Sequence, residues 1–101
     1  MNTKSTNKDN LNLLRKISEG KKHSQRKMAK DLGFSLGKLN YCLNALKKKG
    51  MVKIENFQKH PNKTNYLYIL TPRGIKEKTK LTIAFMDRMM KEYDELKKDL
   101  E

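Results

Sequence analysis

The chain lacks several features that would assign it to common protein classes. It contains a single cysteine, Cys42, so an internal disulfide is impossible, which agrees with a reducing compartment. Its first ten residues hold no apolar run, and no stretch approaches membrane-spanning length. We therefore expect no signal peptide, no contact with a membrane and a cytoplasmic location. The chain also has no internal repeats.

Sequence patterns of enzymes and metal sites are missing as well. There is no glycine-rich phosphate loop, no pair of carboxylates at a plausible spacing and no serine with a base partner. His23, Cys42 and His60 have no regular metal-ligand spacing, so we expect neither a metal nor a cofactor. Cys42 is interpreted as a small core residue, with a redox-sensing thiol as the alternative. We predict that the protein is not an enzyme.

Acidic residues are scarce in the first three quarters of the chain. Residues 1–50 hold 13 Lys and Arg against 3 Asp and Glu, and residues 51–74 hold 4 against 1. Residues 75–101 hold 7 against 7, so the whole net charge of +13 lies before residue 75. This distribution predicts a module that binds a polyanion, followed by a segment that pairs with its own kind. A hydrophobic content of 36% with 7% aromatic residues is low for a monomer, which also favours a partner subunit.

Residues 24–50 have the pattern of a helix-turn-helix. The first helix, with Ser24 as N-cap and the left-handed Gly33 at its end, buries three residues: Met28, Ala29 and Leu32. Ser35 caps the second helix, whose apolar positions recur at steps of three and four: Leu36, Leu39, Leu43 and Leu46. The opposite face carries no acidic residue. Amide, phenol and lysine side chains there can reach base edges and phosphates, and Gly37 lets the backbone approach DNA closely.

Two alternatives stay open for this helix pair. The second helix on its own is equally well explained as an ordinary amphipathic helix with a solvated face, and the lysine run 47–49 by helix capping. Tyr41 is either a packing residue at the edge of the core or an exposed DNA contact, and its position opposite the leucines favours the second. The predicted DNA contacts are Ser24, Gln25, Arg26, Ser35, Gly37, Lys38, Asn40, Tyr41, Asn44, Lys48, Lys59 and Lys63.

The segments on either side complete a winged helix. A helix from residues 5–9 to Glu19 buries Leu11, Leu14 and Ile17, with Leu13 at its edge. Residues 20–23 leave room for a turn or a one-residue bridge of strand. Alternation over 51–57 predicts a half-buried strand, 58–65 a polar turn and 66–70 the returning strand. The predicted fold is mainly α with a small β-hairpin (α+β), a winged helix-turn-helix with a long C-terminal helix.

That last helix begins with Thr71 as N-cap and Pro72 at its first position, and can run nearly 30 residues. Positions 75, 79, 82, 86, 89, 93, 96 and 100 form a heptad seam, polar at first and apolar later. We expect residues 1–74 to form the DNA-binding domain and 75–101 a coiled-coil-like dimerisation helix, rather than a helix folded back onto its own domain. The expected homodimer contacts are Met86, Met89, Met90, Tyr93, Leu96 and Leu100.

These strings resemble a known group of proteins. The run 24–50, MVKIENF at 51–57 and YILTPRG at 68–74 are similar to the winged-helix transcriptional regulators of the MarR family. More narrowly, four strings resemble its small exopolysaccharide-associated subgroup: SLGKLNYCLNALKKKG, VKIENF, LTPRGIKEKTKLT and the closing EYDELKKDLE. The resemblance covers residues 10–101 and implies a dimeric, sequence-specific regulator of double-stranded DNA, expected to repress. The second helix of the pair would lie in the major groove and the wing on the backbone.

The chain departs from that family in two places. The family's wing carries an acidic and a basic residue near its tip, whereas QKHPNKTN at 58–65 has neither Asp nor Arg. Phosphate contacts alone are therefore expected from Lys59 and Lys63. Little of the chain is left for the additional helices that form a ligand pocket, and the sequence names no small-molecule effector. The alternative function is a sequence-blind architectural DNA-binding protein that uses charge alone.

Overall fold

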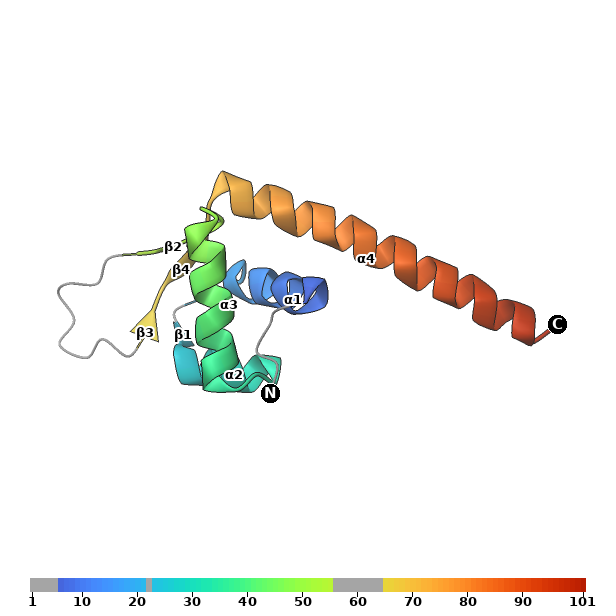
Figure 1. Ribbon diagram of the computed structural model, residues 1–101, viewed down its shortest axis with the longest axis horizontal. Helices are drawn as coiled ribbons and strands as arrows, with labels where there is room; N and C mark the ends of the chain where they lie inside the picture. The colour runs from blue at the N-terminus through green and yellow to red at the C-terminus, as the bar shows by residue number, and fades with distance from the viewer. Residues whose placement is uncertain (1–5, 22, 56–64) are drawn as a thin grey trace.

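A computed structural model describes residues 6–21, 23–55 and 65–101. Three helices and a small hairpin precede one long helix (Figure 1). The mainly α, winged-helix architecture predicted from the sequence is confirmed. The elements are α1 (Asn7–Ile17), β1 (His23–Ser24), α2 (Gln25–Leu32), α3 (Leu36–Lys48), β2 (Val52–Ile54), β3 (Asn65–Tyr66), β4 (Tyr68–Leu70) and α4 (Pro72–Asp99).

Local capping explains where the helices begin and end. Each N-cap hydroxyl accepts a hydrogen bond from the backbone N–H three residues further on, as expected of Ser and Thr at this position. Those N-caps are Thr6, Ser24, Ser35 and Thr71. Gly33 ends α2 with φ 73°, and Pro72 opens α4. The predicted boundaries of α2 and the start of α4 are therefore confirmed.

The hairpin is built from shorter strands than expected. Val52 pairs with Leu70 and Ile54 with Tyr68 in the antiparallel ladder of β2 and β4, and the Glu55 N–H donates to the Leu67 carbonyl at 2.8 Å. The returning strand is interrupted at Leu67, and β3 pairs with β1 instead, so the sequence between α1 and α2 forms a second two-stranded sheet with β3. Residues 56–64, which include Phe57 and most of the predicted wing tip, lie outside the described residues.

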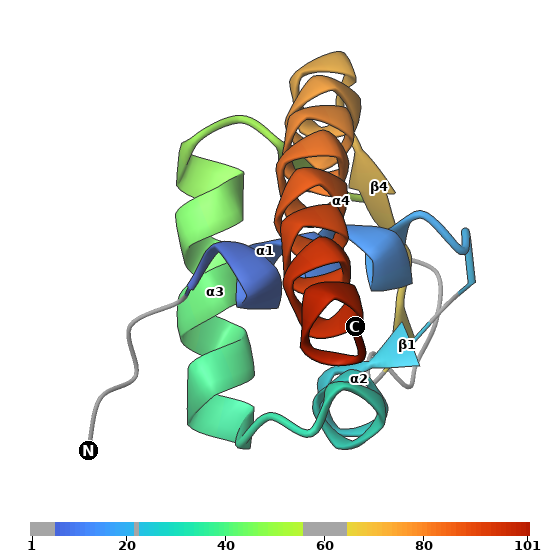
Figure 2. The same cartoon turned by 90° about the vertical axis from the view of Figure 1, so that its right-hand side faces the viewer.

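The core is formed where α1, α2, α3 and the hairpin meet. Its fully buried side chains are Leu13, Leu14, Met28, Leu39, Cys42, Leu43 and Leu46. Leu13, expected at the edge of α1, is completely buried, because α1 is covered on two sides: by the helix pair and by α4 (Figure 2). Leu36, expected in the buried stripe, is 43% exposed, because the first turn of α3 extends beyond the core. Leu32 is only partly buried.

The long helix α4 is fixed to the end of α3 by its first turn. The Thr71 N–H donates to the Met51 carbonyl at 3.0 Å, the Thr71 hydroxyl donates to the Gly50 carbonyl, and Arg73 donates to the Lys49 carbonyl at 3.2 Å. Gly74 lies so close that an added Cβ would stand 2.0 Å from the Met51 carbonyl oxygen. This contact requires glycine at position 74 and sets the direction in which α4 leaves the domain.

That direction gives the molecule its elongated shape. The molecule measures 62 × 30 × 22 Å, and α4 passes over α1 before continuing beyond the rest of the chain (Figure 1). Its radius of gyration, 16.2 Å, exceeds the roughly 13 Å of a compact domain of this length. Within the described residues, no helix is long and apolar enough to cross a membrane.

Candidate nucleic-acid interface

The face of α3 opposite its buried leucines is open. Leu39, Cys42, Leu43 and Leu46 point into the core, which leaves the other side of the helix uncovered. Tyr41 is 48% exposed, and Gly37, Asn40, Asn44 and Lys48 are exposed as well. The N-cap Ser35 is also exposed. The structure thus brings these predicted residues together on one helix, and no acidic residue occurs in α3.

Lys38 makes contacts within its own subunit that the sequence did not indicate. Its ammonium lies 3.0 Å from a carboxylate oxygen of Asp9, on α1, and 4.6 Å from the centre of the Phe34 ring. Asp9 also accepts a hydrogen bond from the Thr6 N–H at 3.2 Å, which closes the capping box of α1. Burial raises the pKa of the Asp9 carboxyl, but the bonds from Lys38 and Thr6 outweigh it and lower the pKa overall. Lys38 therefore ties α3 to α1.

The start of α2 lies next to the hairpin. Arg26 is exposed, and Ser24 is half-buried, with its hydroxyl accepting the Lys27 N–H at 3.1 Å as an N-cap. The Gln25 side-chain amide donates to the Tyr68 hydroxyl at 3.2 Å, so this predicted DNA contact also holds α2 against β4. The pairing of β1 with β3 fixes the same junction through the backbone. The remaining predicted contacts, Lys59 and Lys63, lie outside the described residues.

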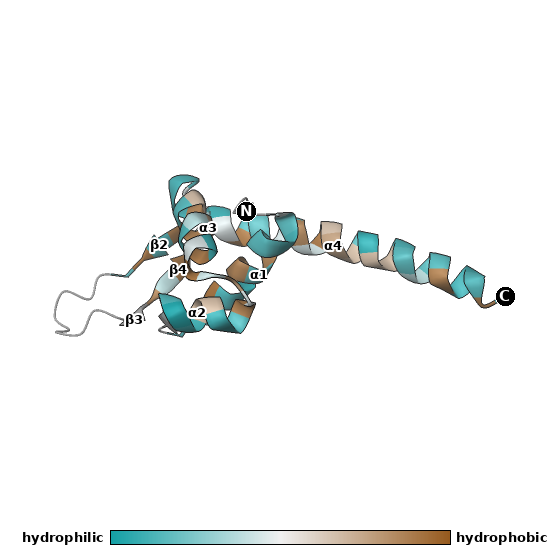
Figure 3. Ribbon diagram, turned by 60° about the horizontal axis from the view of Figure 1, so that its bottom comes forward, coloured by the Kyte–Doolittle hydropathy of each residue, from teal (hydrophilic) through white to brown (hydrophobic). Residues whose placement is uncertain are grey.

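The second half of α4 carries a bare apolar face. We call residues 86–101 the α4 tail. Six of its apolar side chains are between 50% and 89% exposed: Met86, Met89, Met90, Tyr93, Leu96 and Leu100. Brown, hydrophobic positions recur along this part of the ribbon between hydrophilic ones (Figure 3). The first half is different, because Leu81 packs against the core and Phe85 is partly buried beside α1. The tail does not fold back onto the domain (Figure 1).

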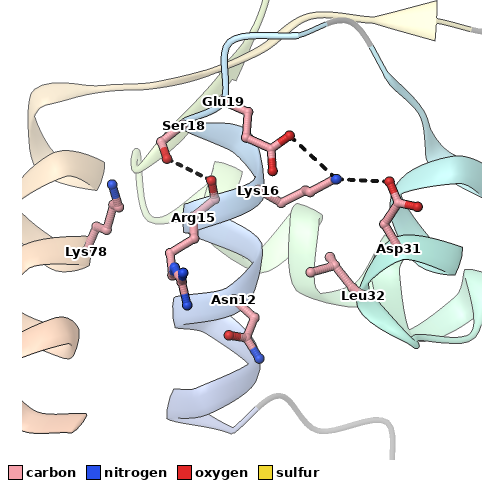
Figure 4. Close-up of a pocket in the computed structure, with 8 residues that line it drawn as sticks. All are labelled: Asn12, Arg15, Lys16, Ser18, Glu19, Asp31, Leu32 and Lys78. Carbon is pink, nitrogen blue, oxygen red and sulfur yellow. Dashed lines mark hydrogen bonds and ion pairs between the residues drawn. The ribbon is translucent and has the colours of Figure 1, made fainter. Parts of the chain in front are cut away.

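A polar cavity of about 580 Å³ lies between α1, α2 and α4 (Figure 4). Lys16 pairs there with Asp31 at 2.9 Å and with Glu19 at 3.5 Å, and the bond from Lys16 lowers the pKa of Asp31. Arg15 of α1 and Lys78 of α4 add two cationic groups to the lining, so positive charge exceeds negative charge. Sequence reasoning missed this cavity, because its lining residues are far apart along the chain. Among the described residues, no three His, Cys, Asp or Glu side chains gather as metal ligands would.

Comparisons with solved structures identify the fold. The chain superposes on Staphylococcus aureus MarR in complex with salicylate and kanamycin with a TM-score of 0.68 at 15% identity, over 85% of this chain and 56% of that one. The transcriptional repressor CouR bound to a 23-mer DNA duplex gives 0.71 at 17% identity, over 93% and 64%. Lactococcus lactis ZitR in complex with DNA gives 0.64 at 18% identity, over 92% and 60%.

These likenesses show a shared winged-helix fold of the MarR type. The chain spans 56–64% of the length of those three structures. In sequence, no family model matches the chain, and no curated protein matches it either. The structural neighbours are transcriptional regulators, and two of these three are bound to DNA.

Proposed function

We propose that this chain is a sequence-specific DNA-binding transcriptional regulator that acts as a homodimer and represses its target genes. The observation that carries the proposal is the exposed face of α3, which presents Tyr41 and Asn44 without any acidic residue in the helix. A polyanion is the partner that such a face accommodates best, because no carboxylate of α3 would repel phosphates.

In this proposal α3 occupies the major groove. Asn44 and Tyr41 reach base edges, with Asn40 and Lys48 on the flanks, and Gly37 permits close approach because even an added Cβ there would have nothing within 4 Å. The Ser35 end of α3 and the start of α2, with Ser24, Gln25 and Arg26, face phosphates, since helix N-termini favour anions. Lys59 and Lys63 of the wing add phosphate contacts.

Lys38 has a structural role in addition to the DNA contact expected of it. Its bond to Asp9 and its place over Phe34 hold α3 against α1, so we assign it to positioning α3 as well as to the DNA-facing side. Its ammonium is already paired when the protein is free. A phosphate or base that recruits Lys38 must therefore compete with Asp9.

Residues 1–74 form the DNA-binding part in this proposal, and residues 75–101 the part that pairs two subunits. The support is the α4 tail, whose apolar face is left uncovered by the described residues of its own subunit. Two copies related by a two-fold axis would read a near-palindromic operator, with half-sites roughly 34 Å apart or a multiple of that distance. We place the protein in the cytoplasm and assign it no catalytic role.

An architectural protein that coats DNA without regard to sequence is the second candidate. The net charge of +13 and its concentration before residue 75 favour this candidate as much as the first. The two are separated by selecting bound duplexes from a random pool and measuring affinity for selected and random duplexes over a salt series. A regulator prefers the selected duplex at every salt concentration, whereas the charge-only protein shows no preference at any.

Two single variants test the assigned face. Asn44→Ala should cost about 1–3 kcal/mol on the selected duplex and relax the preference at one base position, because it removes a base contact. Lys48→Ala should weaken all duplexes alike and reduce the salt slope by about one. Lys91→Ala, on the distant α4 tail, is the control and should leave DNA affinity unchanged. Equal losses on every sequence for Asn44→Ala would show that α3 does not read bases.

The narrower resemblance to exopolysaccharide-associated regulators stays a prediction. It depends on the strings of residues 35–50, 52–57, 70–82 and 92–101, and the solved structures above share only the fold with this chain. Selected operator sequences would test it, because they would locate the target genes in the genome of the source organism.

A further inference from the structure

The α4 tail presents an apolar seam whose charged edges are arranged for one orientation of pairing. Successive seam positions alternate steps of three and four, as in a heptad repeat, with Met86, Tyr93 and Leu100 at a and Met89 and Leu96 at d. Glu92 then occupies a g position and Lys97 the following e position. Both side chains are exposed, and neither forms an ion pair with another described residue.

We propose that two copies of this chain pair through the α4 tail in parallel and in register, with Glu92 of each subunit opposite the partner's Lys97. This inference rests on the proposed homodimer and adds its orientation. In a parallel pair, each g position faces the e position of the next heptad on the other helix, so two Glu92–Lys97 ion pairs flank the seam. Each a and d residue then packs against the same residue of the partner subunit, so apolar side chains contact apolar side chains over residues 86–100.

Antiparallel pairing brings like charges together. It places e opposite e and g opposite g, so pairing of the tail alone sets Glu92 against Glu92 or Asp99 of the partner subunit. A longer antiparallel overlap that reaches residue 75 sets Lys76 against the partner's Lys97 and Lys78 against the partner's Asp99, so its charges balance. Its fault is that it covers the apolar tail with the polar start of the seam, Thr79 and Thr82. The parallel register has neither fault.

The direction of α4 points to the same orientation. The hairpin and α3 lie toward one end of the molecule and the C-terminus lies at the other (Figure 1). Parallel helices are related by a two-fold axis along the pair, which keeps both hairpins and both α3 helices at the same end. A single duplex can then contact both subunits. Antiparallel helices would place the two hairpins at opposite ends of the dimer.

Cross-linking of the full chain tests the orientation directly. Leu100→Cys should form an intersubunit disulfide rapidly under mild oxidation, because parallel pairing brings the two copies of position 100 together at the seam. Antiparallel pairing of the tail, with position 100 opposite the partner's position 86, would hold them about 21 Å apart, given a rise of about 1.5 Å per residue. The unsubstituted chain is the control, since Cys42 is fully buried and should not cross-link.

Charge exchange provides a second, independent readout by sedimentation equilibrium. Glu92→Lys and Lys97→Glu should each weaken dimerisation by about tenfold, and the double exchange should restore it, since only the order of the charges changes. Lys98→Glu makes the same charge change at an outward-facing position and should have little effect. Cross-linking at position 100 together with restoration by the double exchange supports the proposal.

The other outcomes distinguish failure of the parallel orientation from failure of the proposed homodimer. A stable dimer without cross-linking through position 100, or without restoration by the double exchange, overturns the parallel register and leaves the regulator proposal standing. A chain that stays monomeric at every concentration overturns both the orientation and the homodimer of the proposed function.

Discussion

The helical core and the α4 tail use similar apolar side chains in opposite ways. Leu14 and Leu43 are buried within one subunit, whereas Leu96 is 65% and Leu100 89% exposed. The charge differs too, because the excess of Lys and Arg lies before residue 75. The core is complete in a single chain, and its basic surface remains available to a polyanion. The tail lowers its free energy only when another surface covers it.

The largest expected difference is between a leucine-to-alanine substitution in the helical core and the same substitution in the α4 tail. Leu14→Ala removes a fully buried side chain and should cost about 2–5 kcal/mol of unfolding free energy at any protein concentration. Leu96→Ala should cost less than about 0.5 kcal/mol in the dilute, monomeric chain. It should weaken dimerisation by roughly tenfold to hundredfold. Urea unfolding at several protein concentrations measures the loss of stability and the loss of dimerisation. If the two variants lost the same unfolding free energy at every protein concentration, the core and the α4 tail would not differ in this way.

The contact between the first turn of α4 and Met51, which joins the two regions, should be destabilised by one added methyl group. Gly74→Ala places a Cβ against the Met51 carbonyl, which is backbone and cannot move aside cheaply. We expect a loss of about 1–3 kcal/mol in thermal unfolding, with a changed angle between α4 and the domain. Gly37→Ala is the matched control, since nothing lies within 4 Å of that position. It should stabilise the helix by up to about 1 kcal/mol. If Gly74→Ala left thermal unfolding unchanged, the start of α4 would not be held tightly against the Met51 carbonyl.

Substitutions at Ser35 can separate folding from DNA contact within the core. Its hydroxyl accepts the Lys38 N–H at 3.1 Å, so Ser35→Ala should cost about 1 kcal/mol by removing the N-cap. Ser35→Asp keeps a capping oxygen and should unfold like the unsubstituted chain. It should nevertheless bind DNA more weakly, because a carboxylate then faces phosphates. Calorimetry and a DNA titration on the same samples test this, and unchanged DNA affinity would remove Ser35 from the interface.

The smallest expected effect depends on pH. Since the folded pKa of Asp9 is lowered, its ion pair contributes stability above the unfolded pKa of about 3.9, and this is lost as pH falls through the folded value. Asp9→Asn should cost about 0.5–1 kcal/mol at neutral pH and progressively less below about pH 4. Asp87→Asn, on exposed α4, is the control. A difference that stays constant in acid would exclude the Asp9–Lys38 pair as its source.

Most of the fold could be predicted from sequence because the residues that begin and end its helices act locally. Ser24, Gly33, Ser35 and Thr71 act through their own hydroxyl or backbone angles, so the helix boundaries they set were recognisable without tertiary information. Helical periodicity likewise identified the buried side of α3, and the exposure of Tyr41 agrees with that prediction. The corrections at Leu13 and Leu36 arise because periodicity shows which side of a helix is apolar and not how many neighbours cover it.

The parts that could not be predicted involve residues far apart in the chain. Asp9 and Lys38 are separated by most of α1 and the whole of α2, and only the packing of α1 against α3 brings them together. The pairing of β1 with β3 and the approach of Gly74 to Met51 depend on tertiary structure in the same way. The DNA contacts and the dimer seam stay predictions that the variants above are designed to test.

The fixed first turn of α4 makes the helix a rigid arm. Its 28 residues extend about 42 Å at about 1.5 Å per residue. A rotation of only about 5° at one end therefore displaces the other by roughly 3.5 Å, which is about the rise of one base pair. Small differences in how Gly74 seats against Met51 would thus be enough to change which operator spacing a pair of subunits can span.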